Sequence, residues 1–406
     1  MLSIKTKTRG LLAPAALVLA ALLLCLAPLN VATASVRAID HLDGLHWGSF
    51  DIQQEIMPDV SVAAGALVSS DGRILWSRNL DMRRSPASIT KIMTAILAVE
   101  NLDSDEEIIL PSMPIGPHES RAHLRPGDTL TREQLLQALL IVSGNDAAHA
   151  IAVAVAGDVP SFAEMMSERA LELGMNDTQF KNASGIDQEG QFSTARDIAT
   201  MSRFALDMPE IREIVGIVEL ELDTQRAQHS LTNTNVLLQS YDGATGIKTG
   251  FTRAAGFSIS MSAQRDDLEL IAVVLGTRDD LARFFDARSL LDFGFTHYRT
   301  QNLAIKNAVV GRAQVTNFPD RTVQVAVGED VVLPVLDLAG PIDQIIEIDD
   351  VRSPIKRGDR LGHISFTQRG RLVARVPLVA TQDVSNPFFL VQWYYNAVIA
   401  LRGDTN

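Results

Sequence analysis

The sequence predicts an α/β (α+β) fold, in which an antiparallel sheet is flanked by helices, a helical lobe is inserted, and a small all-β domain follows. Two observations carry this prediction. Hairpin patterns bracket a helical middle between about Gly48 and Tyr298. Past about Arg299 the pattern changes to short alternating runs that are typical of strands. A chain of 406 residues is long enough for two domains, which we expect at residues 35–298 and 299–386.

The N-terminus has the pattern of a signal peptide over residues 1–34. Three cations at residues 5–9 precede a mostly apolar stretch at residues 11–26, and Ala32-Thr33-Ala34 offers a cleavage site. An uncleaved anchor is the alternative, but the apolar stretch is shorter than the roughly 20 residues that a span needs. The only cysteine, Cys25, lies in this segment, so the exported chain would have no disulfide and no thiol chemistry.

The charge balance limits the classes of partner. The net charge is −13 and becomes more negative when the N-terminal segment is removed, because that segment carries cations and no acid. No basic patch offsets this charge, so a nucleic-acid partner is not expected. The eight histidines are scattered without metal-ligand spacing, and no metal or cofactor is expected.

Two hairpins are predicted in the first domain. Residues 64–69 and 74–76 flank Asp71-Gly72, a good hairpin turn, and residues 256–262 and 268–275 form the second pair. We expect these strands to build the antiparallel sheet.

Helix starts are predicted between the two hairpins. Thr131 with Gln134 makes a capping box ahead of a leucine-rich run. Ser161 with Glu164 opens another helix, which Gly174 would close.

The second domain is predicted from alternation and turns. Valines alternate with polar residues from Val323 to Val327, and residues 362–367 and 372–379 form a hairpin around Gln368-Arg369-Gly370. This domain contains no convincing catalytic set of residues.

The last segment, residues 387–406, is predicted as an amphipathic, membrane-associating tail. On a helix from Pro387 to Arg402, one broad face gathers Leu390, Trp393, Tyr394, Ala397, Val398 and Leu401. Such a helix is too short to cross a bilayer but can lie on one. The alternative is packing on its own domain or on another subunit.

A helix start at Ser88-Ile89-Thr90-Lys91 carries the first chemical motif. An apolar side that includes Ile92 and Met93 predicts a helix, on which Ser88 and Lys91 lie one turn apart on the same face, near the positive N-terminal end. A hydroxyl nucleophile and an amine base therefore meet by local geometry. Ser353-Pro354-Ile355-Lys356 has the same spacing, but its proline predicts a loop, where the spacing guarantees no contact.

Two further motifs follow in order, Ser143-Gly144-Asn145 and Lys248-Thr249-Gly250. Together the three motifs supply a nucleophile, a base, relay groups and a cation for an anionic substrate, which is the equipment of an acyl-transferring serine enzyme. No histidine lies within the motifs, so Lys91 is the available base. It must be neutral to act, which requires a pKa lowered by desolvation and by a neighbouring cation such as Lys248.

The ordered motifs, with residues 246–252 and Ser193-Thr194-Ala195-Arg196-Asp197, resemble the low-molecular-mass penicillin-binding proteins that are serine-type D-alanyl-D-alanine carboxypeptidases. The resemblance extends from about Val60 to Phe389. It implies the penicillin-binding/β-lactamase-like transpeptidase fold, with the active site in the cleft between the sheet and the helical lobe.

The resemblance also implies the catalytic roles. Ser88 would be acylated by the carbonyl of the penultimate D-Ala of a peptidoglycan pentapeptide, and Ser143 would pass a proton to the leaving D-Ala. Asn145 would help to hold Lys91 and the substrate amide. Water would then hydrolyse the acyl-enzyme, and β-lactams such as penicillins would inhibit by acylating Ser88.

The third motif would bind substrate. By the same resemblance, Lys248 and Thr249 would hold the terminal carboxylate, and Gly250 would belong to the same substrate-binding stretch. The backbone N–H groups of Ser88 and Phe251 would form the oxyanion hole. The implied location is periplasmic, on the outer face of the inner (cytoplasmic) membrane, with the C-terminal helix on the membrane surface.

Three alternatives keep part of this interpretation. A β-lactamase would need a carboxylate that activates water, and Glu172 lies four residues before Asn176. A D,D-endopeptidase would use the same residues on crosslinks. A catalytically idle wall-binding scaffold would have lost the serine or the lysine of the first motif, and both are present.

Two other segments resemble the family without a predicted catalytic role. Arg196 is expected to brace a helix start by pairing with a carboxylate. Asn182, Ser184 and Gly185 resemble a loop near the cleft, and we assign them no function.

Overall fold

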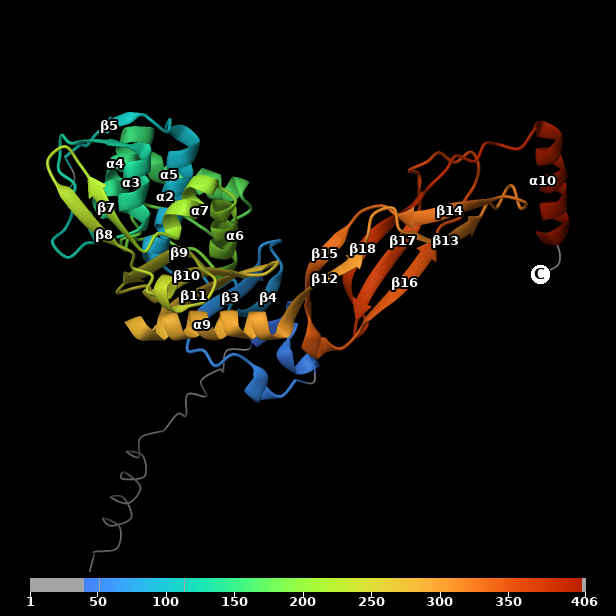
Figure 1. The fold of residues 1–406 in the computed structure, drawn as a ribbon, viewed down its shortest axis with the longest axis horizontal. Coiled ribbons are helices and arrows are strands. Elements are labelled where there is room, and N and C mark those ends of the chain that lie inside the picture. The colour runs from blue at the N-terminus through green and yellow to red at the C-terminus, as the bar shows by residue number, and fades with distance from the viewer. Residues whose placement is uncertain (1–39, 51, 113, 404–406) are drawn as a thin grey trace, which may run out of the picture. The chain divides into compact units, whose positions relative to one another are not determined.

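A computed structural model describes residues 40–50, 52–112 and 114–403. The predicted signal peptide and Cys25 lie outside these residues. The fold is the expected one: a large antiparallel sheet with helices on both faces, followed by a β domain (Figure 1).

The large sheet has seven strands in the order β2-β1-β4-β3-β11-β10-β9. Both predicted hairpins are confirmed, as β3–β4 and β10–β11. The strands are β1 (Asp40–Leu42), β2 (Leu45–His46), β3 (Ala64–Ser69), β4 (Ile74–Arg78), β9 (Ala244–Thr252), β10 (Gly256–Arg265) and β11 (Leu268–Thr277). Strand β9 lies at the edge, which leaves one of its sides free to face the helical lobe.

Alternating side chains of β11 bury both faces of this sheet. Ile271 and Val273 enter the core under the helical lobe, whereas Ala272 and Val274 enter the core under α9 (Asp280–His297). Helix α9 covers one face in Figure 1, and the lobe lies on the other. The lobe and its approaches contain α2 (Lys91–Asn101), α3 (Arg132–Leu140), α4 (Asn145–Ala156), α5 (Val159–Glu172), α6 (Ala195–Leu206) and α7 (Pro209–Val215). The short helix α8 (Leu237–Ser240) instead buries Leu237 in the core under α9.

One predicted helix start is confirmed and one is wrong. Thr131 and Gln134 form the capping box of α3. Helix α5, however, begins at Val159, because Asp158 accepts the backbone N–H of Ser161 and is the N-cap. Ser161 therefore lies inside the first turn, where Pro160 stands as a favourable early residue. Gly174 follows the helix end with φ of +82°, as expected for a residue in the left-handed region.

Short elements complete the first part of the chain. They are the hairpins β5 (Glu107–Ile109) with β6 (Thr129–Thr131) and β7 (Glu219–Asp223) with β8 (Gln228–Thr232), and the 3₁₀ turns η1 (Trp47–Phe50), η2 (Gln54–Ile56) and η3 (Ala87–Thr90).

The β domain follows α9. Its main sheet has the order β13-β14-β18-β17-β16, and β17–β18 is the predicted hairpin. Val323, Val325 and Val327 are all buried on β14, as their alternation predicts. The elements are β12 (Tyr298–Ala304), β13 (Val309–Gln314), β14 (Thr322–Val327), β15 (Val331–Leu336), η4 (Asp337–Ala339), β16 (Ile342–Ile348), β17 (Arg360–Gln368), β18 (Arg371–Ala380) and α10 (Phe389–Gly403).

Within the described residues, no single helix has both the length and the apolar character needed to cross a membrane. Helices α4 and α5, which meet at 83°, satisfy length and composition only as a bent pair. Ile151, Phe162 and Met166 of this pair are fully buried in the protein core.

Candidate active site

The first motif lies at the junction of η3 and α2. Ser88 is in the 3₁₀ turn and is half-buried, and Lys91 is the first residue of α2. Lys91 Nζ lies 3.1 Å from Ser88 Oγ, 2.7 Å from Asn145 Oδ1 and 2.8 Å from the Ser184 carbonyl oxygen. The amine is thus held by three acceptors, one of which is the candidate nucleophile.

Burial makes Lys91 a candidate base. Its side chain is fully buried, which lowers its pKa from 10.5 to about 7, while the charges of Glu119 and Asp146 act in the opposite direction. From the sequence we expected desolvation and the charge of Lys248 to lower the pKa of Lys91 together. Desolvation is the dominant cause. The repulsion between the two amines appears in the pKa of Lys248, which burial, Lys91 and Arg283 hold well below its usual range.

The second motif forms the corner between α3 and α4. Ser143 is buried with φ of +66°, and its hydroxyl has no hydrogen-bond partner among the described residues. Asn145 begins α4, accepts from Lys91 through Oδ1, and donates from Nδ2 to Glu119 Oε2 at 2.6 Å. Ser143 is therefore a free hydroxyl, and Asn145 connects the base to a carboxylate.

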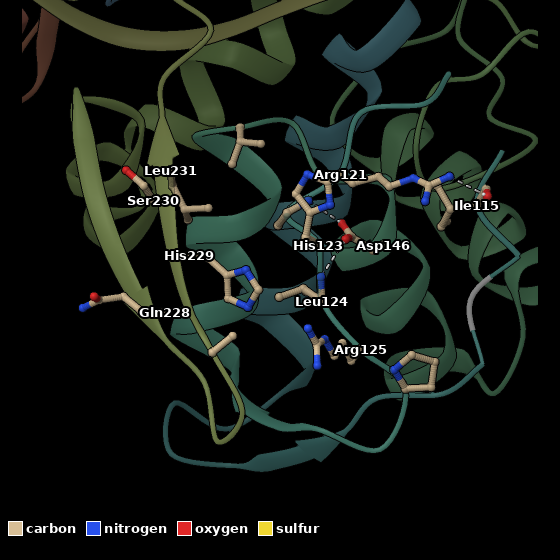
Figure 2. A pocket seen from close by; sticks show the side chains of 14 residues that line it. Ile115, Arg121, His123, Leu124, Arg125, Asp146, Gln228, His229, Ser230 and Leu231 are labelled. Atoms are coloured by element: carbon tan, nitrogen blue, oxygen red, sulfur yellow. Dashed lines mark hydrogen bonds between the residues drawn. The ribbon is translucent and has the colours of Figure 1, made fainter. Parts of the chain in front are cut away.

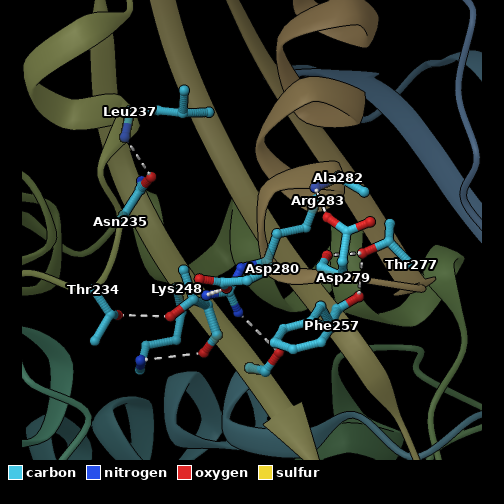
Figure 3. Close-up of polar contacts among 12 residues, drawn as sticks. Thr234, Asn235, Leu237, Lys248, Phe257, Thr277, Asp279, Asp280, Ala282 and Arg283 are labelled. Carbon is cyan, nitrogen blue, oxygen red and sulfur yellow. Dashed lines mark hydrogen bonds and ion pairs between the residues drawn. The ribbon is translucent and has the colours of Figure 1, made fainter.

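The third motif lies on the edge strand β9. Thr249 Oγ1 shares a hydrogen bond of 2.6 Å with Thr234 Oγ1 (Figure 3). Within the part of the chain that the structure describes, Lys248 Nζ donates only to the Thr249 carbonyl oxygen, at 3.3 Å. A Cβ at Gly250 would lie 3.0 Å from the Ser88 backbone nitrogen. Glycine at this position therefore permits the close approach of β9 to the turn that carries Ser88.

Arg283 comes to the same place from α9. Its Nη1 donates to the Gly250 carbonyl oxygen at 3.2 Å, and its Nη2 pairs with Asp280 (Figure 3). Burial lowers the pKa of Arg283, an effect that the charge of Asp280 opposes. Arg283 therefore brings a guanidinium group into the lining of the site, and the amine of Lys248 is buried beside it.

These elements enclose a pocket of about 380 Å³. Its lining contains six of the residues chosen from the sequence: Ser88, Ser143, Asn145, Thr249, Gly250 and Phe251. Lys91 and Lys248 are buried beside this lining rather than part of it. Phe251 is 51% exposed at the rim and stacks on Phe257 with ring centroids 4.2 Å apart.

Several lining residues were not identified from the sequence. They are His118, Glu119, Ser120, Ile186, Asp187, Thr234 and Arg283, whereas Gly185 and Thr252 belong to segments that the sequence had linked to the family without a predicted role. Ser184 contributes its carbonyl oxygen to Lys91, so the identity of its side chain gives no clue to this role. Glu119 and Arg283 reach the site from segments that contain none of the three motifs.

The remaining candidates have structural surroundings. Glu172 ends α5, is bound to Arg169 at 2.9 Å and does not line the pocket, so it is not placed to activate water there. Arg196 pairs with Asp81 at 2.6 Å, as expected for a brace. Ser353 lies in a loop and bonds to Asn317, not to Lys356. Among the described residues, no group of three or more histidine, cysteine or acidic side chains is arranged to hold a metal ion.

Comparisons with known proteins agree with this geometry. A family model described as D-alanyl-D-alanine carboxypeptidase matches residues 53–279, and one described as the penicillin-binding protein 5 C-terminal domain matches residues 298–386.

Individual relatives cover most of the chain. The D-alanyl-D-alanine carboxypeptidase DacF of Bacillus subtilis is 31% identical over 80% of this chain and 87% of its own length. DacC of Escherichia coli is 32% identical over 82% and 86%, respectively. The crystal structure of the D-alanyl-D-alanine carboxypeptidase DacD from Francisella tularensis has a TM-score of 0.70 at 26% identity and covers 84% of this chain and 98% of its own.

Proposed function

The chain belongs to the D-alanyl-D-alanine carboxypeptidase family, and from this we propose that it removes the terminal D-alanine from peptidoglycan pentapeptide stems through an acyl-enzyme on Ser88. The observation that carries the proposal is the contact of 3.1 Å between Ser88 Oγ and Lys91 Nζ. With a pKa of about 7, the amine is substantially neutral at neutral pH. It can therefore act as the base that a serine nucleophile requires.

Acylation begins when neutral Lys91 takes the proton of Ser88 and Oγ attacks the carbonyl carbon of the penultimate D-Ala. The backbone N–H groups of Ser88 and Phe251 stabilise the oxyanion of the tetrahedral intermediate. When the C–N bond breaks, the free hydroxyl of Ser143 relays the proton from Lys91 to the leaving amine. Water then attacks the ester, and Lys91 takes the proton of that water. Because Lys91 lies within hydrogen-bond distance of Ser88 Oγ, it passes this proton to Ser88 as the ester bond breaks.

The terminal carboxylate of the substrate fits beside Arg283 and the buried Lys248. Lys248 and Arg283 supply the charge, and Thr249, which is held by Thr234, supplies a hydroxyl donor. Among the described residues Lys248 Nζ donates only to the Thr249 carbonyl oxygen, and a bound carboxylate would favour its ammonium form. This arrangement selects a peptide with a free C-terminus over an internal bond.

Penicillins are proposed as inhibitors on the same chemistry. Ser88 would open the β-lactam ring, and the carboxylate of the drug would occupy the site of the D-Ala carboxylate. A β-lactamase function is not favoured, because Glu172 does not line the pocket.

Free D-alanine release from acetyl-Lys-D-Ala-D-Ala tests the proposal. We expect release by the wild-type protein and none by Ser88→Ala. Ser353→Ala is the matched control, because its Ser-x-x-Lys spacing lies in a loop, and it should retain activity. No release from a folded wild-type protein would contradict the carboxypeptidase. Cleavage of a crosslinked D-Ala-containing dimer in that case would indicate the endopeptidase, and no cleavage at all would indicate the scaffold.

We also propose the location and the division of the chain. Residues 1–34 would direct export, residues 35–298 would form the catalytic domain, and residues 299–386 would form the β domain. The tail at residues 387–406 would hold the protein on the outer face of the inner membrane. In support, Phe389, Leu390 and Trp393 at the start of α10 are between 60 and 74% exposed.

A further inference from the structure

A second and larger pocket lies outside the catalytic one. Its volume is about 700 Å³, within the range of small-molecule sites. One side is the segment of residues 121–126, and the facing side is β8 with His229 (Figure 2). The lining residues are different from those of the catalytic pocket.

Basic side chains with unused donors line this pocket. The side chains of His123 and Arg125 are exposed and make no hydrogen bond or ion pair within the described residues. His229 Nε2 is shielded from solvent and also has no hydrogen-bond partner. Arg121 is the only one of the four that is held, through Nη2, by the carbonyl oxygens of Ile115 and Gly116.

The lining holds two arginines and a single acidic side chain, so the arginine charge is only partly offset. Asp146 is buried, and its carboxylate accepts the backbone N–H groups of Ala122, Leu124 and Ala147 at 3.0, 3.1 and 3.0 Å. Its charge is therefore already stabilised by the backbone. In a chain with a net charge of −13, a concave group of arginine and histidine side chains with free donors favours a negatively charged ligand.

The remaining lining describes the body of that ligand. Leu124, Val142 and Leu231 give the pocket an apolar part beside the cations. We propose that this pocket binds an organic carboxylate with an apolar body, about the size of a dipeptide, with Arg125 and His229 as the principal donors. A small inorganic anion would leave the apolar part unfilled.

The position suggests two sources for the carboxylate. Ser120 lines the catalytic pocket and Arg121 lines this one, and Asn145 and Asp146 are divided in the same way. The ligand is therefore either a free organic acid or an acidic residue of the peptide whose end enters the catalytic pocket. The second source rests on the proposed function.

Calorimetric titration tests the site directly. The probe is N-acetyl-Leu-Glu, which carries two carboxylates, and the control probe is the neutral N-acetyl-Leu-Gln amide, both at constant ionic strength. We expect saturable binding of the dicarboxylate alone. Binding should weaken at least ten-fold in the double variant Arg125→Gln/His229→Gln and stay unchanged in Arg312→Gln, which alters an exposed arginine of the β domain.

Arg125→Glu is the second variant, because the exposed position of Arg125 tolerates a charge reversal even if the double variant does not fold. Absence of saturable dicarboxylate binding, or equal binding by the wild type and both variants, would overturn the proposal. This result does not depend on Ser88, so it is independent of the carboxypeptidase activity.

A kinetic comparison separates the two sources. D-Alanine release is measured from acetyl-Lys-D-Ala-D-Ala and from the same peptide extended by γ-D-Glu. If Arg125→Glu lowers kcat/KM several-fold on the extended peptide only, the substrate supplies the carboxylate. If Arg125→Glu changes kcat/KM equally on both peptides, the γ-D-Glu carboxylate does not bind in this pocket. The ligand that binds in the titration is then a free acid.

Discussion

Lys91 controls how the activity depends on pH. A base acts in its neutral form, so activity should be low below its pKa and should rise as pH increases through that value. With the Lys91 pKa lowered to about 7 by burial, the acid limb of kcat/KM is expected near pH 7. The pH at which kcat/KM rises therefore reports the pKa of Lys91 in the free enzyme.

Glu119 should determine part of that position. Its carboxylate raises the pKa of Lys91, so Glu119→Gln should move the acid limb to lower pH. Gln keeps an acceptor for Asn145 Nδ2 but can no longer serve Gly116 N with a second carboxylate oxygen, so a modest loss of kcat is also expected. The measurement is the pH profile of D-alanine release for the wild type and the variant.

The control for Glu119→Gln is Glu133→Gln, which removes the same charge at an exposed position on α3. It should leave the limb unchanged. A limb that moves equally in both variants would mean that net charge, rather than the contact with Asn145, sets the Lys91 pKa.

At the residue scale, contacts between residues close in the sequence could be predicted, and contacts between distant segments could not. Ser88 and Lys91 are one turn apart, so their contact could be predicted from local spacing alone. Glu119 and Arg283 come from distant segments, and only tertiary folding places them at Asn145 and Gly250. No local sequence pattern distinguishes Glu119 and Arg283 from the other charged residues of the chain.

At the element scale, the loop that holds Lys91 must approach the turn that carries Ser88. Gly185 has φ of +87°, and a Cβ there would lie 1.8 Å from the Ala87 carbonyl oxygen. Gly185→Ala must therefore displace either the loop or η3. We expect it to destabilise the protein by more than about 2 kcal/mol and to lower D-alanine release, as measured by urea unfolding and activity.

Gly174→Ala separates strain from collision. Gly174 has a similar φ of +82°, but a Cβ there would meet nothing within 4 Å. This variant should cost only the conformational penalty of about 1 kcal/mol and should keep its activity. If the two variants behave alike, close packing of the loop on η3 is not what positions Ser88.

A helix or strand could be predicted where its turn or cap residues offered a single interpretation. The hairpins β3–β4 and β10–β11 have turn residues between apolar runs, and they were predicted correctly. The start of α5 was misplaced because Asp158 and Ser161 are both good cap residues three positions apart, and only the backbone geometry selects Asp158. Helix α9 buries Arg283 and Asp286 along with Phe284, which obscures an apolar face.

At the scale of the whole molecule, the order of the three motifs predicted the fold and a cleft between sheet and helical lobe, but not the size or the lining of that cleft. The cleft needs the edge strand β9, the corner before α4 and the turn before α2 to meet, and these contacts are all between distant segments. The size and lining of the cleft, and the second pocket next to it, follow only from that meeting.

Membrane attachment is the prediction at this scale. Helix α10 presents Trp393 and Tyr394, 74 and 59% exposed, whereas Tyr395 is buried, with its ring 5.7 Å from that of Phe318. Three residues of the predicted apolar face, Leu390, Trp393 and Tyr394, are thus exposed, while Tyr395 is packed against the protein. The only cation between Pro387 and Arg402 is Arg402, so attachment would depend on apolar burial and should resist high salt.

Sedimentation with phospholipid vesicles tests this attachment. The wild-type protein should sediment at both low and high salt, because apolar burial is not screened by ions. A chain that ends at Pro387, and the variant Trp393→Glu/Tyr394→Glu, should remain in the supernatant with unchanged D-alanine release. Asn396→Asp adds one charge on the polar side of the same helix and should sediment like the wild type. If the truncated chain still sediments, another part of the molecule binds the membrane, and the exposed aromatic side of α10 then requires a protein partner.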